Sequence, residues 1–153
     1  LPTVVDAVKL PVVAAGGIVD GRGVAAALLL GASAVQIGTA LLRCPEAKVA
    51  SAWAEALGQT APEDTMVSRV FSGRPARSIA NSYARAATSP SAPPAAPYPV
   101  QRGLTQAMRD AAVKDNDVER MQAWAGQSAS LTKAIPAGEV VRRMWKDAQA
   151  LLR

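Results

Sequence analysis

Residues 11–42 read PVVAAGGIVDGRGVAAALLLGASAVQIGTALL, and this stretch decides the fold. A short apolar run at Val12–Ala15 ends at two adjacent glycines, and Asp20 then precedes an alanine- and leucine-rich run that stops at Gly31. A second apolar run, Ala34–Ile37, also ends at a glycine. The pattern predicts strand, glycine turn, helix, strand, glycine turn and helix, with Asp20 as the N-cap of the first helix and Gly31 just beyond its end.

The two glycine turns, Gly16-Gly17 and Gly38-Thr39, are the candidate binding elements. Two strands joined by a crossover helix run parallel, so both turns are expected at the same edge of the sheet. Backbone N–H groups at such turns, aided by the positive end of a helix dipole, bind anions. The spacing favours a phosphate group held between the turns over glycines that only let the chain turn.

One polar side chain, Gln36, interrupts the second apolar run. A buried amide without a partner costs about 1–3 kcal/mol, so Gln36 needs hydrogen bonds. Neighbouring backbone inside the sheet could supply them. A ligand at the end of the strand could also do so, because Gln36 stands two residues before Gly38. Thr39 could both cap the following helix and contact the same ligand.

Composition excludes several classes of protein. The chain has 153 residues and is 50% hydrophobic, which suffices for a core but is short of the roughly 250 residues of a (β/α)₈ barrel. The net charge is +5, but the basic residues are scattered and not interleaved with stacking aromatics, which argues against nucleic acid. With no His and one Cys, neither a zinc site nor a disulfide framework is predicted. No apolar run approaches the length of a membrane span, and a cytoplasmic protein is expected.

Beyond the second glycine turn the sequence predicts mainly helices. An amphipathic helix is expected over 46–57, another after Pro75, and two more over 101–113 and 118–125. Residues 66–71 alternate like a strand, and residues 88–99 form a proline-rich connection. The last helix carries an apolar stripe made of Val141, Met144, Ala148 and Leu151.

Three stretches carry a resemblance to a known family. Residues 11–39 resemble the nitronate monooxygenases, formerly called 2-nitropropane dioxygenases, and FMN-carrying enoyl-acyl-carrier reductases have a similar stretch. The segment FSGRPARSIAN at 71–81 is similar to the family's TGRPAR-type segment. PYP at 97–99 and MQAWAGQSA at 121–129 resemble the nitronate monooxygenases more than the reductases.

The resemblance implies an α/β fold, the C-terminal part of a (β/α)₈ TIM barrel followed by a mostly helical subdomain. Residues 1–58 would be the last βα units of an FMN-binding barrel. Residues 59–136 would be a mainly helical lid or insert that contains the proline-rich connection at 88–99. Residues 137–153 would be a helix that packs back on the barrel. The N-terminal barrel portion would then come from a segment that precedes this chain.

The resemblance also implies chemistry. The whole protein would use FMN and O₂ to oxidise alkyl nitronates to a carbonyl compound and nitrite. The expected FMN-binding residues are Gly16, Gly17, Gln36, Ile37, Gly38, Thr39, Gly126 and Gln127. The family's catalytic His lies upstream of the resembling segments, so no catalytic residue is assigned here and the isolated chain is expected to be inactive.

Two alternatives stay open. The protein could be an FMN-dependent enoyl-acyl-carrier reductase that takes electrons from a reduced nicotinamide, or this chain could be a non-catalytic, truncated fragment without flavin. The partners expected under the favoured hypothesis are a small nitronate or nitroalkane, O₂ and the remaining barrel portion, with neither nucleic acid nor membrane.

Overall fold

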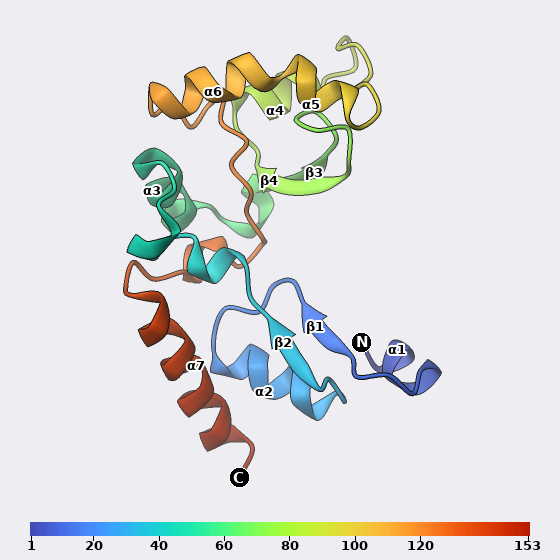
Figure 1. Ribbon diagram of the computed structural model, residues 1–153, viewed down its shortest axis with the longest axis vertical. Coiled ribbons are helices and arrows are strands. Elements are labelled where there is room, and N and C mark those ends of the chain that lie inside the picture. Colours follow the sequence, from blue (N-terminus) through green and yellow to red (C-terminus); the bar gives the residue numbers. More distant parts are fainter. The chain divides into compact units, whose positions relative to one another are not determined.

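The computed structural model describes all of residues 1–153, and its contacts divide the chain into two compact units (Figure 1). The first unit combines residues 1–48 with 131–153, and the second contains residues 49–130. The boundaries expected from the sequence lie at 58 and 136. Residues 51–59 belong to the second unit, where the Asn116 side chain accepts a hydrogen bond from the Ala52 N–H and donates one to the Ser51 hydroxyl.

The first unit is built on a parallel β-α-β crossover. Its elements are α1 (Pro2–Ala7), β1 (Val13–Ala15), α2 (Gly21–Leu29), β2 (Ala34–Gln36), the 3₁₀ turns η1 (Thr39–Leu41) and η2 (Pro45–Ala47), and α7 (Ala137–Leu151). Strands β1 and β2 pair in parallel, with Ala15 opposite Gln36 at the end of the register. The strand, helix and strand predicted from residues 11–42 are therefore confirmed.

The ends of α2 are also as predicted. The Asp20 carboxylate accepts a hydrogen bond from the Gly23 N–H at 3.0 Å and so caps the helix. At the other end, Gly31 adopts φ +93°, and its N–H donates to the Leu28 carbonyl. A positive φ is easy only for glycine, which explains why the helix stops at this residue.

The helix predicted after the second glycine turn is wrong. Only the three-residue 3₁₀ turn η1 follows Gly38, and the helix expected over 46–57 begins at Ser51 as α3 (Ser51–Gln59). Cys44 has extended backbone and precedes a proline, and Lys48 adopts φ 50°. Both conformations interrupt helical hydrogen bonding, so the chain makes two short turns before a helix can form.

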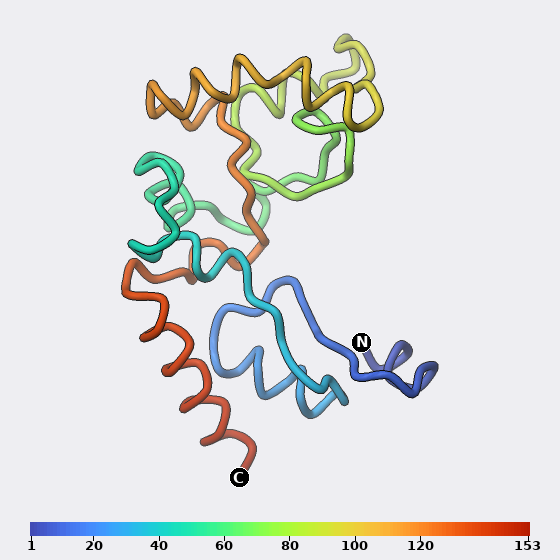
Figure 2. Tube along the Cα trace, in the orientation of Figure 1, coloured from blue at the N-terminus to red at the C-terminus, as the bar shows by residue number.

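Helix α7 packs on α2, as the Cα trace also shows (Figure 2). Val140, Met144 and Ala148 form its buried stripe. The predicted stripe was partly wrong, because Val141 and Leu151 are 51% and 54% exposed. Residues 140, 144 and 148 recur every fourth position, which is the spacing of one helix face. With 15 residues α7 is the longest helix, and no helix combines the length and apolarity needed to cross a bilayer.

The second unit combines helices with a small antiparallel sheet. Its elements are α3, the 3₁₀ turn η3 (Pro62–Asp64), β3 (Thr65–Ser68), β4 (Ala76–Ile79), α4 (Ser82–Ala87), α5 (Val100–Leu104) and α6 (Gln106–Lys114), and a last 3₁₀ turn, η4 (Ala129–Leu131), lies at its boundary. Strands β3 and β4 are antiparallel, with Thr65 opposite Ile79. The helix expected directly after Pro75 is therefore wrong, because β4 comes first and α4 begins only at Ser82.

The helix predicted over 118–125 is also wrong. This segment ends in extended backbone beside β4: the Ile79 N–H donates to the Ala123 carbonyl at 2.9 Å, and the Ala125 N–H donates to the Arg77 carbonyl at 3.2 Å. The Asn81 amide donates to the carbonyls of Val118 and Met121. An open strand edge and a buried amide thus satisfy backbone groups that a helix would have paired internally.

The segment FSGRPAR packs against PYP within the second unit. Gly73 adopts φ +86°, and a Cβ placed there would overlap the backbone of residues 96–98. The Arg74 guanidinium lies 3.9 Å from the centroid of the Tyr98 ring. Arg77 donates to the Thr65 hydroxyl at 2.8 Å. These contacts give the motif a structural role in holding the second unit together.

Candidate functional site

The two glycine turns leave the sheet at the same edge. Ala15 is paired with Gln36 at the ends of the two parallel strands, so the turns that follow, Gly16-Gly17 and Gly38-Thr39, both begin at the carboxyl edge of the sheet. Neighbouring strands lie about 4.8 Å apart, which is within the span of one phosphate group and its hydrogen bonds. The prediction that both turns lie at the same edge of the sheet is therefore confirmed.

Space is open beside the turns. No heavy atom lies within 4 Å of a Cβ built on Gly16, Gly17 or Gly38. Gly16 and Gly17 have φ values of +93° and +73°, a backbone conformation that residues other than glycine rarely adopt. The N–H groups of Gly17 and Gly38 donate to no acceptor within the chain. Successive N–H groups in such turns form concave anion sites.

Asp20 changes the electrostatics expected at α2. Its carboxylate accepts hydrogen bonds from the Gly23 N–H and from the Arg22 guanidinium, the latter at 2.8 and 2.6 Å. Burial acts to raise the pKa of Asp20, but the Gly23 N–H and Arg22 outweigh it and lower this pKa below its ordinary value of 3.8. An internal anion thus already uses the positive end of α2. The turns themselves, and not two helix dipoles, supply the open donors.

The remaining predicted site residues are divided between the units. Gln36 is exposed at the end of β2, on the face opposite Val35. The Ile37 side chain is partly buried and packs on the core shared by α2 and α7. Thr39 begins η1, directly after Gly38. Gly126 and Gln127 belong to the second unit, where they follow the extended segment beside β4.

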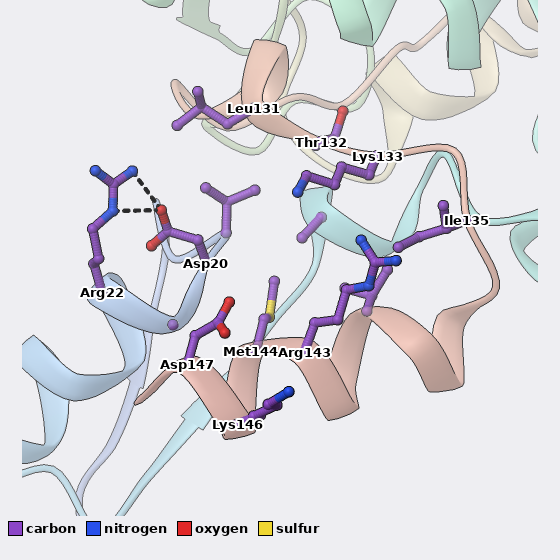
Figure 3. A pocket seen from close by; sticks show the side chains of 14 residues that line it. Asp20, Arg22, Leu131, Thr132, Lys133, Ile135, Arg143, Met144, Lys146 and Asp147 are labelled. Atoms are coloured by element: carbon purple, nitrogen blue, oxygen red, sulfur yellow. Dashed lines mark hydrogen bonds and ion pairs between the residues drawn. The ribbon is translucent and has the colours of Figure 1, made fainter. Parts of the chain in front are cut away.

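A cavity of about 500 Å³ lies at the start of α2, between this helix and α7 (Figure 3). Acidic, basic and apolar side chains all line this cavity, and the apolar ones include Met144 and Ile135. The charged lining residues are Asp20, Arg22, Lys133, Arg143, Lys146 and Asp147. None of the glycines of the two turns lines this cavity, so it is a neighbour of the candidate phosphate site and not the site itself.

Sequence reasoning missed how close α7 comes to the turns. A Cβ on Gly21 would stand 2.5 Å from the Asp147 Cβ, 2.7 Å from the Ala148 nitrogen and 2.9 Å from the Met144 carbonyl oxygen. Glycine at the first position of a helix is a weak helix former, and this is the one sequence signal that pointed to a close helix contact. Position 21 is four residues beyond Gly17, so α7 braces the helix that follows the first turn.

The single cysteine is not part of the site. Cys44 is buried in the core shared by α2 and α7. Burial raises the pKa of its thiol, and the nearby Glu46 raises it further. The thiolate, which is the nucleophilic form, is therefore disfavoured at neutral pH.

Parallel strands joined by a crossover helix, with glycine turns at the carboxyl edge, are typical of α/β proteins, and here they form part of a (β/α)₈ barrel. Solved structures agree. A nitroalkane oxidase from Streptomyces ansochromogenes matches 99% of this chain with a TM-score of 0.88 and 40% identity, and 44% of that chain is covered. FabK from Thermotoga maritima matches 99% of this chain with a TM-score of 0.80 and 32% identity, and the match covers 48% of the FabK chain. Both are TIM-barrel enzymes.

The family follows from the sequence comparisons. A model described as nitronate monooxygenase matches residues 1–147, and the chain belongs to this family. A nitronate monooxygenase of Pseudomonas aeruginosa is 44% identical over 139 residues, which cover 91% of this chain and 40% of that protein. A nitronate monooxygenase of Paraburkholderia phytofirmans is 40% identical over 139 residues, which cover 91% of this chain and 38% of that protein. The chain thus spans about two fifths of the length of these relatives and matches their C-terminal part.

Proposed function

We propose that this chain supplies the FMN phosphate-binding part of an enzyme that oxidises alkyl nitronates with O₂ to a carbonyl compound and nitrite. The observation that carries the proposal is the adjacency of two open glycine turns on paired parallel strands. Membership of the nitronate monooxygenase family supports the reaction.

The residues of the turns fit a phosphate in shape and in chemistry. Gly17 and Gly38 each offer an N–H with no acceptor in the chain, and the space beside both is open. Hydrogen bonds from backbone N–H groups to a charged oxygen contribute roughly 1.5–3 kcal/mol each. Side chains at these positions would occupy the space that the phosphate oxygens need. Thr39 follows directly and could add its hydroxyl.

Each part of the chain has a distinct task under this proposal. Gly16, Gly17, Gly38 and Thr39 would hold the phosphate, and Gln36 would present its amide to the ligand from the end of β2. We extend the proposal to Gly126 and Gln127, which would contribute from the second unit. FMN, when bound, would supply the electron-transfer chemistry, and the protein would position it. Since the chain contains no His, an acid–base group of that type must come from another segment, and we expect the isolated chain to be inactive.

The phosphate site is tested by comparing FMN with riboflavin, which lacks the phosphate. We expect this protein to quench FMN fluorescence at lower concentration than riboflavin. Gly38→Ala introduces a side chain without a positive-φ penalty, since Gly38 has φ −116°. Loss of one charge-assisted hydrogen bond predicts roughly 10- to 100-fold weaker FMN binding and a nearly unchanged riboflavin affinity.

Gly103→Ala is the matched control. Gly103 also has open space around it, but it lies in α5 of the second unit. Its replacement should leave both affinities unchanged. Equal affinity of the wild type for FMN and riboflavin, or a Gly38→Ala variant that keeps the full preference for FMN, contradicts the proposed phosphate site.

The reaction is tested on the complete enzyme. Consumption of O₂ with propyl-2-nitronate in the absence of nicotinamide supports nitronate oxidation. An FMN-dependent enoyl-acyl-carrier reductase is the second candidate, because such reductases have a stretch similar to residues 11–39, and rapid oxidation of NADH or NADPH with an enoyl thioester would favour it. A colourless complete enzyme with no bound flavin would contradict both.

A further inference from the structure

The cavity between α2 and α7 lies outside the proposed phosphate site and has no task in it. Its volume of about 500 Å³ is that of a small-molecule site, for which roughly 300–1,000 Å³ is typical. Every residue that lines it belongs to the first unit, so its shape depends only on that unit. The chemistry of the lining therefore indicates which kind of ligand would fit.

Apolar side chains from three segments form the walls of the cavity. Val19 precedes α2, Ile135 precedes α7, and Val140 and Met144 lie on the buried stripe of α7. Leu131 also lines the cavity and is 55% exposed, although it is large and apolar. A ligand with an apolar part would remove this surface from water, which favours binding.

Two basic side chains, Lys133 and Arg143, extend into the cavity from the segment before α7 and from α7 itself (Figure 3). Lys133 takes part in no ion pair, and Arg143 pairs with Glu139 through its Nη2 atom. The remaining N–H groups of both side chains can donate to a negatively charged oxygen. Together they form a site for the head group of an anion.

The acidic residues limit the charge of that anion. Arg22 neutralises Asp20. Glu139 likewise neutralises Arg143. The other charged residues of the lining are two lysines and Asp147, which leave one net positive charge. This lining balances a head group with a single negative charge, whereas a phosphate dianion would bring a second charge that nothing balances.

We propose that this cavity is a further binding site, which takes an aliphatic monocarboxylate such as hexanoate. Lys133 and Arg143 donate hydrogen bonds to the carboxylate, and the alkyl chain lies on Leu131, Ile135 and Met144. Because α2 and α7 both line the cavity, the occupant stabilises their contact and raises the melting temperature of the protein. The site does not depend on FMN binding, so it stands or falls separately from the proposed function.

Titration calorimetry on the complete enzyme, in the presence and absence of added FMN, compares four probes. Acetate keeps the carboxylate of hexanoate but lacks most of its alkyl chain, hexylamine reverses the charge, and hexyl phosphate adds a second negative charge. Since each buried methylene strengthens binding roughly fourfold, we expect hexanoate to bind at least tenfold more tightly than acetate. It should also bind more tightly than hexylamine and hexyl phosphate, with an affinity that FMN does not change.

Lys133→Gln and Arg143→Gln test the head-group site. Both positions are exposed, so both variants should keep the circular dichroism spectrum of the wild type. Each removes a charged hydrogen-bond donor, and we expect about tenfold weaker binding of hexanoate. Arg142→Gln is the matched control, because Arg142 is exposed on the same helix and carries the same charge but does not line the cavity. It should bind hexanoate as the wild type does.

The proposal is overturned if hexanoate shows no saturable binding, or if acetate, hexylamine or hexyl phosphate binds as tightly. It is also overturned if the Lys133→Gln and Arg143→Gln proteins bind hexanoate as well as the Arg142→Gln control. Competition between hexanoate and FMN would contradict it too, since hexanoate would then occupy the flavin site. Hexanoate binding that depends on Lys133 and Arg143 in an enzyme that fails to bind FMN would overturn only the proposed function.

Discussion

Gly21→Ala is expected to destabilise the first unit, although alanine is the better helix former. Replacing glycine by alanine in a helix ordinarily stabilises by up to about 1 kcal/mol. At position 21 the added Cβ would stand 2.5 Å from the Asp147 Cβ, and the other two close atoms, the Ala148 nitrogen and the Met144 carbonyl oxygen, belong to the backbone of α7. None of these atoms can move alone, so the helices must separate.

The size of the effect follows from these distances. Ordinary contact begins at 3.4 Å, so the gap must grow from 2.5 Å by roughly 1 Å. Overpacking of this kind costs typically about 1–3 kcal/mol. At roughly 2–4 °C per kcal/mol for a chain of this size, the melting temperature should fall by several degrees. A shift of α2 also moves the turn at Gly17, and we expect FMN affinity to fall with it.

Thermal unfolding followed by circular dichroism measures the first effect, and FMN titration measures the second. Gly23→Ala is the control, because it lies in the same helix turn but its Cβ would meet Ile18 at an ordinary 3.4 Å. That variant should be as stable as the wild type or slightly more stable. A Gly21→Ala protein that melts at or above the wild-type temperature would refute the close contact between α2 and α7.

Three further predictions concern single residues. The pKa of Asp20 is lowered in the folded chain, so its stabilising effect is present above its unfolded pKa of about 3.8 and is lost as pH falls through the lower folded value. The stability advantage of wild type over Asp20→Asn in denaturant titrations should therefore be constant above about pH 5 and shrink steadily as the pH falls below about 3.8. Cys44 should react with a thiol reagent much more slowly in native than in denatured protein, and equal rates would show that it is not buried. Gly73→Ala should lower stability by more than about 1 kcal/mol, because φ is +86° and the Cβ would overlap backbone near Tyr98; unchanged unfolding would contradict this packing.

Local sequence was sufficient for the β-α-β unit and for the position of the two glycine turns. The apolar runs, the cap at Asp20 and the stop at Gly31 act through hydrogen bonds and backbone freedom within a few residues of each position. Because parallel pairing follows from the crossover, the location of both glycine turns at one edge of the sheet also followed from sequence. The family resemblance, confirmed by comparison, rested in part on these same residues.

Elements that depend on distant partners could not be predicted in this way. Residues 121–125 have a pattern compatible with a helix, but the open edge of β4 offers hydrogen bonds that hold them extended. The residues after Pro75 form a strand for the same reason, since β3 is available to pair with them.

The sequence by itself determined the parallel crossover and its glycine turns, because short-range capping, chain reversal and strand burial are encoded within about thirty consecutive residues. Only packing between distant elements settled which face of α7 is buried, how closely α7 approaches Gly21, and that Val141 and Trp145 stay half exposed. Such contacts join residues more than a hundred positions apart, and their geometry depends on how whole helices pack, which no local pattern specifies.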